Sequence, residues 1–66
     1  MKKGSILIIE DEVQLNNFLV EFMESYFENV YSALNGEEGF SLYDEKKPDV
    51  IITDIDMPKM NGLDLL

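Results

Sequence analysis

Hydrophobic and polar positions along the chain divide it into segments of two kinds. Short continuous apolar runs, mostly of β-branched residues, occupy Ile6–Ile9 and Val50–Ile52. Runs of this length are typical of strands buried on both faces, as in the middle of a parallel sheet. A shorter run at Val30–Ala33 predicts a strand at the edge of that sheet. The pattern therefore predicts strands at about residues 5–9, 30–33 and 50–53.

Between the first two predicted strands, apolar residues return with the spacing of a helix. They fall at i, i+3, i+4, i+7, i+8, i+11 and i+12, which places them on one face of a helix over about residues 13–28. That face comprises Leu15, Phe18, Leu19, Phe22, Met23, Tyr26 and Phe27. Asp11 or Glu12 stands near the start, where the helix dipole favours an acid. We expect this face to pack on the sheet.

A second helix is predicted over about residues 36–45. Asn35 precedes it and has a side chain that can cap the first turn. Pro48 marks the point beyond which the helix cannot continue. Phe40 and Tyr43 are its large apolar residues, and we expect them to point inward.

The predicted elements follow the order β-α-β-α-β, and residues 62–66 look like the start of a third helix. Alternation of this kind predicts an α/β fold with a parallel sheet and right-handed crossovers. The first and third strands are the most apolar, so we expect them to be neighbours, with the second strand outside the first. Ligands of such sheets bind beyond the carboxyl ends of the strands.

Composition excludes several classes of protein. The 66 residues allow one domain, and they include 14 acidic residues, five lysines, no histidine and no cysteine, for a net charge of −9. A cysteine nucleophile, a disulfide framework and a Cys/His zinc site are excluded, and a cytoplasmic location is expected. No basic patch is available to bind nucleic acid. No apolar run approaches the roughly 18 residues that a membrane span requires.

Acidic residues follow two of the apolar strands. Glu10 and Asp11 come directly after the first strand, and Asp54 comes directly after the third. If these strands are parallel neighbours, the three carboxylates converge. Two like charges 4 Å apart repel by about 4 kcal/mol at an effective dielectric constant of 20, so a proton or a cation is needed at the site. Oxygen ligands of this kind suit Mg²⁺. The alternative is a set of solvated strand-end acids with no metal.

Asp54 has a second potential role. A carboxylate beside a bound Mg²⁺ can act as the nucleophile on a phosphoryl group and form an aspartyl phosphate. A calcium-binding loop is a weaker alternative for the segment that starts at Asp54 and Asp56. Pro58 and Lys59 occupy positions where such a loop needs a ligand and its turn glycine.

These residues resemble a known family. The run Ile52–Gly62 contains the pattern Asp-x-Asp-Met-Pro-x-Met-x-Gly and resembles the phosphorylation-site signature of response-regulator receiver domains in two-component signalling. The run Ile6–Glu12 is similar to the acidic pocket of the same family, and Lys46–Ile52 is similar to its lead-in to the third strand. The resemblance extends over essentially the whole chain.

The resemblance implies a flavodoxin-like doubly wound sheet in which these strands take the order 2-1-3. It implies that Asp54 is the phosphoacceptor and that the phosphodonor is a histidine kinase. It also implies that Asp11 and Asp54 bind Mg²⁺ directly, that the backbone carbonyl of Asp56 supplies a third ligand, and that Glu10 acts through water. By the same resemblance, the chain is not an independent enzyme beyond self-phosphorylation at Asp54.

A full receiver of this family has two more strands and two more helices, which carry a switch Ser or Thr and a phosphate-pairing lysine. We therefore expect the chain to be the N-terminal half, with impaired phosphotransfer, since losing one electrostatic stabiliser of a transition state costs roughly 10²–10³-fold. We also expect the third strand to be an exposed edge that pairs with a second copy, so that dimerisation completes the sheet. The alternative function is a self-associating interaction module without phosphotransfer.

Overall fold

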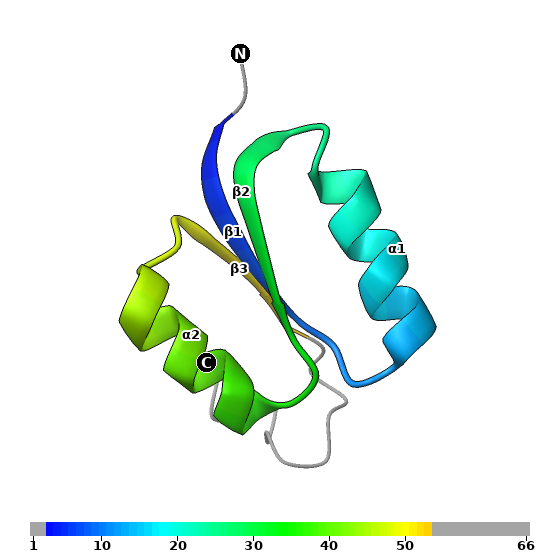
Figure 1. Ribbon diagram of the computed structural model, residues 1–66, viewed down its shortest axis with the longest axis vertical. Helices are drawn as coiled ribbons and strands as arrows, with labels where there is room; N and C mark the ends of the chain where they lie inside the picture. Colours follow the sequence, from blue (N-terminus) through cyan, green and yellow to red (C-terminus); the bar gives the residue numbers. More distant parts are fainter. Residues whose placement is uncertain (1–2, 54–66) are drawn as a thin grey trace.

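The computed structural model describes residues 3–53, which form a parallel sheet of three strands between two helices (Figure 1). The elements in chain order are β1 (Lys3–Ile9), α1 (Val13–Met23), β2 (Phe27–Ala33), α2 (Gly36–Lys46) and β3 (Val50–Thr53). The sheet order is β2-β1-β3. The predicted α/β class, element order and strand order 2-1-3 are confirmed. The predicted third helix, at 62–66, lies outside the described residues.

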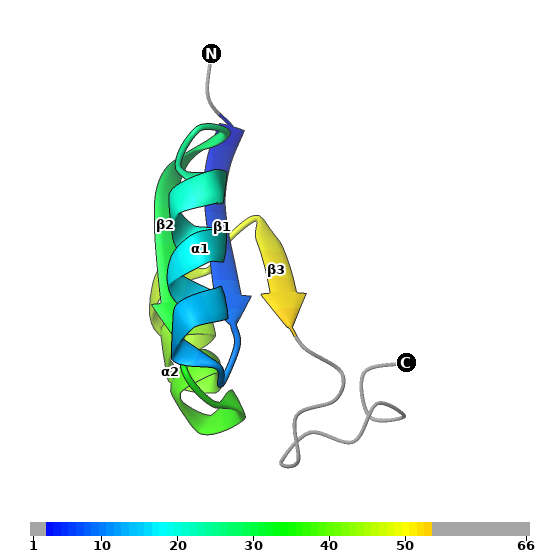
Figure 2. The same ribbon diagram turned by 90° about the vertical axis from the view of Figure 1, so that its right-hand side faces the viewer.

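The two helices lie on opposite faces of the sheet (Figure 2). Both contact β1 and β2, whereas β3 contacts only β1 among the described elements. The central strand β1 is therefore enclosed by a strand on each side and a helix on each face. Its residues Ile6, Leu7 and Ile8 are at most 1% exposed. No helix within residues 3–53 is long and apolar enough to cross a membrane.

A side-chain clamp joins β1 to β3 at the amino end of β1. The backbone N–H of Ser5 donates to Asp49 Oδ2 at 2.9 Å, and the backbone N–H of Asp49 donates to the Ser5 carbonyl at 3.0 Å. A Cβ added at Gly4 would collide with the Asp49 carboxylate. The clamp precedes a parallel register in which Leu7 pairs with Ile51.

Helix α1 is shorter than predicted, so the predicted end at residue 28 is wrong. It ends at Met23, and Phe27 already belongs to β2, where it pairs with Lys3 of β1. The predicted strand at 30–33 is correspondingly too short. Tyr26 and Phe27 fit the helical spacing, but aromatic residues also favour strands, and pairing with β1 decides between the two.

Helix α1 is also rotated about its axis relative to the predicted apolar face. The residue that it buries is Asn16, at 3% exposure, while Leu19 and Met23 are half-buried. Phe18 and Phe22 are 60% and 49% exposed, and their rings stack on each other at 6.3 Å between centroids. The predicted face is therefore only partly covered by the sheet.

Helix α2 begins as the sequence predicts. Asn35 Oδ1 accepts the backbone N–H of Glu38 at 2.8 Å, and Glu38 Oε1 accepts the backbone N–H of Leu34 at 2.8 Å. This reciprocal arrangement satisfies two backbone donors at the start of the helix. At the other end, Lys47 adopts a left-handed conformation with φ of 47°, and Pro48 follows.

The expectation that Phe40 and Tyr43 point inward is wrong. Phe40 is 74% exposed and Tyr43 is 42% exposed. Gly36 and Gly39 are buried instead, and a Cβ added at Gly39 would lie 2.8 Å from Ile9 Cγ1. The missing side chain lets the backbone of α2 approach β1 closely, and this approach sets the orientation of the helix.

Candidate functional site

The candidate site lies at the carboxyl end of β1. Glu10 follows the strand and is 5% exposed, and its backbone N–H donates to the Ala33 carbonyl of β2 at 3.0 Å. Its carboxylate turns back into the following loop, where Oε2 accepts the backbone N–H of Glu12 at 3.0 Å. Asp11, between them, is exposed to solvent. Glu10 and Asp11, which we call the acid pair, thus differ in their surroundings. The Glu10 carboxylate is buried and accepts a backbone hydrogen bond, whereas the Asp11 carboxylate is exposed and can reach a cation.

The start of α1 holds this loop in place. Glu12 is the N-cap, and its Oε1 accepts the backbone N–H of Leu15 at 2.7 Å. One turn into the helix, the Asn16 side chain returns to the strand ends. Its Nδ2 donates to the Glu10 carbonyl and to the Ala33 carbonyl, each at 3.0 Å. Asn16 therefore ties together α1, the end of β1 and the end of β2.

Sequence reasoning missed Asn16. It lies one position away from the predicted apolar face, and polar residues inside helices usually face solvent. A weak signal was present, because Asn16 and Asn17 are adjacent in an otherwise helical stretch. Asparagine lowers helix propensity because its side chain competes for backbone hydrogen bonds. An asparagine in the first turns of such a helix therefore indicates a specific backbone partner.

The third predicted strand ends beside the first. Thr53, the last residue of β3, pairs in parallel register with Ile9, the last residue of β1. The other two predicted site residues, Asp54 and Asp56, lie outside the described residues. Within residues 3–53, no three His, Cys, Asp or Glu side chains gather closely enough to hold a metal ion.

The described part of the site fits a hard divalent cation in its chemistry. The side chains at the carboxyl end of β1 offer carboxylate oxygens, which are the ligands that Mg²⁺ prefers. The Asp11 carboxylate is exposed and can bind a cation, whereas Glu10 Oε2 already accepts a hydrogen bond from the loop backbone.

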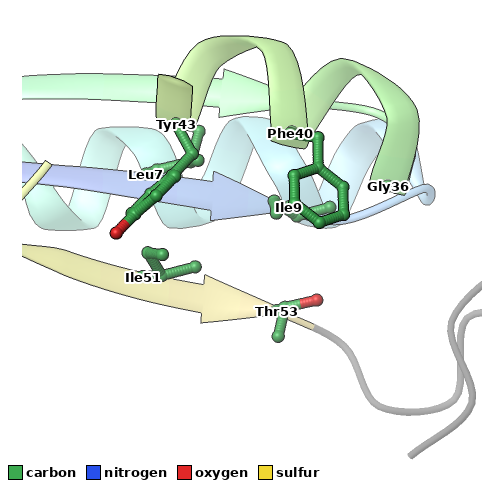
Figure 3. Close-up of a pocket in the computed structure, with 8 residues that line it drawn as sticks. Leu7, Ile9, Gly36, Phe40, Tyr43, Ile51 and Thr53 are labelled. Carbon is green, nitrogen blue, oxygen red and sulfur yellow. The ribbon is translucent and has the colours of Figure 1, made fainter. Parts of the chain in front are cut away.

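An apolar cleft of about 230 Å³ opens between α2 and β3 (Figure 3). Its walls come from α2 and β3, and β1 forms its floor, with no acidic residue among those that line it. The lining residues are Leu7, Ile9, Gly36, Gly39, Phe40, Tyr43, Ile51 and Thr53. Phe40, which is 74% exposed, stands at this cleft together with Ile9 of β1. The cleft is a packing surface distinct in chemistry from the acid pair.

Comparison with known proteins identifies the family. The family model for the response regulator receiver domain matches residues 6–66. The chemotaxis protein CheY of Listeria monocytogenes is 40% identical over 62 residues, covering 92% of this chain and 52% of that protein. The transcriptional regulatory protein HptR of Staphylococcus aureus is 36% identical over 64 residues, covering 92% of this chain and 25% of that protein.

A solved structure agrees with these matches. The N-terminal domain of an uncharacterised protein from Wolinella succinogenes superposes with a TM-score of 0.79 and 46% identity, covering 96% of this chain and 49% of that chain. The chain spans about a fifth to a half of the length of the curated relatives it matches. The fold, the position of the acid pair and these matches agree: the chain belongs to the response regulator receiver domain family.

Proposed function

We propose that the chain is the phosphoacceptor module of a two-component phosphorelay and that it accepts a phosphoryl group from a histidine kinase on Asp54. One structural observation carries most weight. Ile9 and Thr53 pair in adjacent parallel strands, and they immediately precede Glu10 and Asp54 in the sequence. Parallel strands that end together deliver the residues that follow them to one edge of the sheet. The family match over residues 6–66 supports the same assignment.

The proposed chemistry is a nucleophilic transfer. A carboxylate oxygen of Asp54 attacks the phosphorus atom, the bond from phosphorus to the kinase histidine breaks, and its electron pair returns to the imidazole. Mg²⁺, when bound, would neutralise part of the negative charge that the acceptor carboxylate and the phosphoryl group bring together. Asp11, Asp54 and the Asp56 backbone carbonyl are the proposed ligands. Glu10 would act on the ion through water.

We also propose a location and a partner for the chain. We place it in the cytoplasm, with a histidine kinase as its partner and without direct contact to nucleic acid, given the net charge of −9. The chain provides the acceptor carboxylate and the ligands, whereas the phosphodonor provides the reactive bond. It is therefore a substrate of phosphotransfer, with at most self-phosphorylation as an activity of its own.

The test is labelling with a small phosphodonor such as acetyl phosphate, read by mass spectrometry of the intact chain and its peptides. We expect slow addition of one phosphoryl group to Asp54, only when Mg²⁺ is present, in keeping with the impaired phosphotransfer that the sequence predicts. Asp54→Asn removes the nucleophile and should abolish the label. Asp56→Asn is the matched control, because it changes a carboxylate to the same amide two residues away but keeps the proposed backbone ligand. Equal labelling of Asp54→Asn and the unmodified chain contradicts the proposal.

A second candidate function, self-association through β3, is favoured by the exposure of that strand. Val50 and Ile51 are 40% and 44% exposed, and no strand pairs with the outer edge of β3 among the described residues. We propose that two copies pair their third strands antiparallel about a two-fold axis, in the order 2-1-3-3′-1′-2′. An apolar edge strand is a template for such pairing.

Light scattering distinguishes this candidate. The chain should have the molar mass of a dimer at micromolar concentration, and Ile51→Lys should shift it to the monomer by placing a charge at the junction. Ser32→Lys is the control, because it makes the same charge change at an exposed position of β2, on the opposite edge of the sheet. A monomer for the unmodified chain, or an equal effect of both variants, contradicts pairing through β3. A dimer that cannot be phosphorylated would favour the interaction module over the phosphoacceptor.

A further inference from the structure

Asn16 is the buried polar residue of α1, and both hydrogen bonds that its side chain donates go to the ends of strands. It is 3% exposed, and its Nδ2 donates to the carbonyl oxygens of Glu10 and Ala33, each at 3.0 Å. Ala33 O also accepts the backbone N–H of Glu10 at 3.0 Å. A single carboxamide thus joins the residue that ends β2 to the residue that begins the acid pair.

The position of the Glu10 carbonyl oxygen affects the orientation of the next residue, Asp11. The carbonyl of Glu10 and the backbone nitrogen of Asp11 belong to one planar peptide unit, which also includes the Cα of Asp11. Fixing the oxygen of that unit therefore restricts the direction in which the Asp11 side chain leaves the backbone. The Glu10 side chain is restricted separately, because its Oε2 accepts the backbone N–H of Glu12. Because Asn16 is buried, water does not compete for the hydrogen bonds from its Nδ2 to the Glu10 and Ala33 carbonyl oxygens.

A residue other than Asn16 caps the N-terminus of α1. Glu12 is the N-cap and accepts the backbone N–H of Leu15 at 2.7 Å. The N-cap is therefore provided without the side chain of Asn16, whose backbone N–H donates to the Glu12 carbonyl at 2.8 Å while its Nδ2 donates to strand ends. This separation of tasks indicates that Asn16 serves the loop that carries the acids.

We propose that Asn16 is a positioning residue for the cation site, which acts through the Glu10–Asp11 peptide unit to fix the direction of the Asp11 carboxylate. The inference rests on the proposed function, since it concerns the affinity of the same site for Mg²⁺. Outer-shell partners of this kind typically change metal affinity by roughly 10–100-fold when they are removed. Asn16→Leu, which has a similar volume and no donor, should weaken Mg²⁺ binding by about that factor.

The experiment is a calorimetric titration of the chain with Mg²⁺ alone, after circular dichroism has shown that each variant is folded. Asn16→Ser is the second variant, because its hydroxyl can donate one hydrogen bond and its small side chain avoids a clash. It should weaken binding by less than Asn16→Leu, and it decides the matter if Asn16→Leu does not fold. Unchanged affinity in a folded Asn16 variant overturns the positioning role.

The control for a merely structural effect is Asp49→Ala. This substitution removes hydrogen bonds between β1 and β3 at the other end of β1, roughly 16 Å from Glu10 at the usual rise per residue of a strand. It should lower stability and leave Mg²⁺ affinity unchanged. An equal loss of affinity in Asp49→Ala would overturn the proposal in favour of general destabilisation.

The two proposals fail in different ways in this titration. If the unmodified chain gives no heat of Mg²⁺ binding, the metal site of the proposed function is wrong, and the role of Asn16 is wrong with it. If the unmodified chain binds Mg²⁺ and the Asn16 variants bind it equally well, the metal site stands and the positioning role alone is wrong.

Discussion

Strands β1 and β3 have similar sequences and different surroundings. Both are short apolar runs that are followed by an acid, and they pair in parallel with Leu7 opposite Ile51. Leu7 is 0% exposed, whereas Ile51 is 44% exposed. The difference comes from neighbours, because β1 has a strand on each side and a helix on each face, while β3 contacts only β1 among the described elements. An apolar pattern therefore reports a capacity for burial, and the neighbouring elements determine how much burial is achieved.

Truncating the paired residues Leu7 and Ile51 tests the difference in burial between β1 and β3 most directly. Leu7→Ala should lower the free energy of unfolding by about 3 kcal/mol, because it leaves a cavity in the fully buried strand. Ile51→Ala, at the facing position of β3, should cost about 1 kcal/mol, since much of that side chain is already in water. Urea unfolding followed by circular dichroism measures both. Equal losses would mean that β3 is as enclosed as β1.

A smaller loss of stability is expected when a side chain is added at Gly39, where α2 lies close to β1. Gly39→Ala places a Cβ against the Ile9 side chain, and overpacking of this kind costs about 1–3 kcal/mol. Part of that loss is offset by the better helix propensity of alanine. Ser41→Ala is the control, because it lies on the same helix in an exposed position and should be neutral or slightly stabilising. A Gly39→Ala variant as stable as Ser41→Ala would show that α2 does not depend on close contact with β1.

The smallest of the three effects concerns the clamp between β1 and β3. Asp49→Ala removes the acceptor for the Ser5 backbone N–H and should cost about 1 kcal/mol. Asp44→Ala makes the same charge change at an exposed ion pair with Lys47, 3.4 Å apart, and such pairs contribute less than about 1 kcal/mol. Thermal unfolding of both variants tests the prediction. A larger loss for Asp44→Ala would contradict the importance of the clamp.

The sequence was sufficient to predict the features that depend on local pattern. The apolar run ending in Glu10 predicts a buried strand with an acid at its carboxyl end, and the structure has both. The cap at Asn35 depends on one side chain and its neighbours, and it was also predictable. These features need no knowledge of what packs on them.

The features that were not predictable depend on tertiary contacts. The rotation of α1 follows from the hydrogen bonds of Asn16 to two strand ends, which no periodicity reveals. Its end at Met23 depends on the pairing of Phe27 with β1. The exposure of Phe40 follows from the close approach of Gly39 to Ile9. In each case a contact between distant residues outweighs the local preference.

The central claim is that β1 and β3, despite their unequal burial, bring their acids to one cation site. The most direct test is the free energy of unfolding in urea, with and without Mg²⁺, for the unmodified chain, Asp11→Asn and Asp54→Asn. Without Mg²⁺, both variants should be more stable than the unmodified chain, because each removes a like charge from the site. At ten times its dissociation constant, Mg²⁺ should stabilise the unmodified chain by about 1.4 kcal/mol and the two variants by much less. Equal stabilisation of all three chains by Mg²⁺ would contradict a shared site at the ends of β1 and β3.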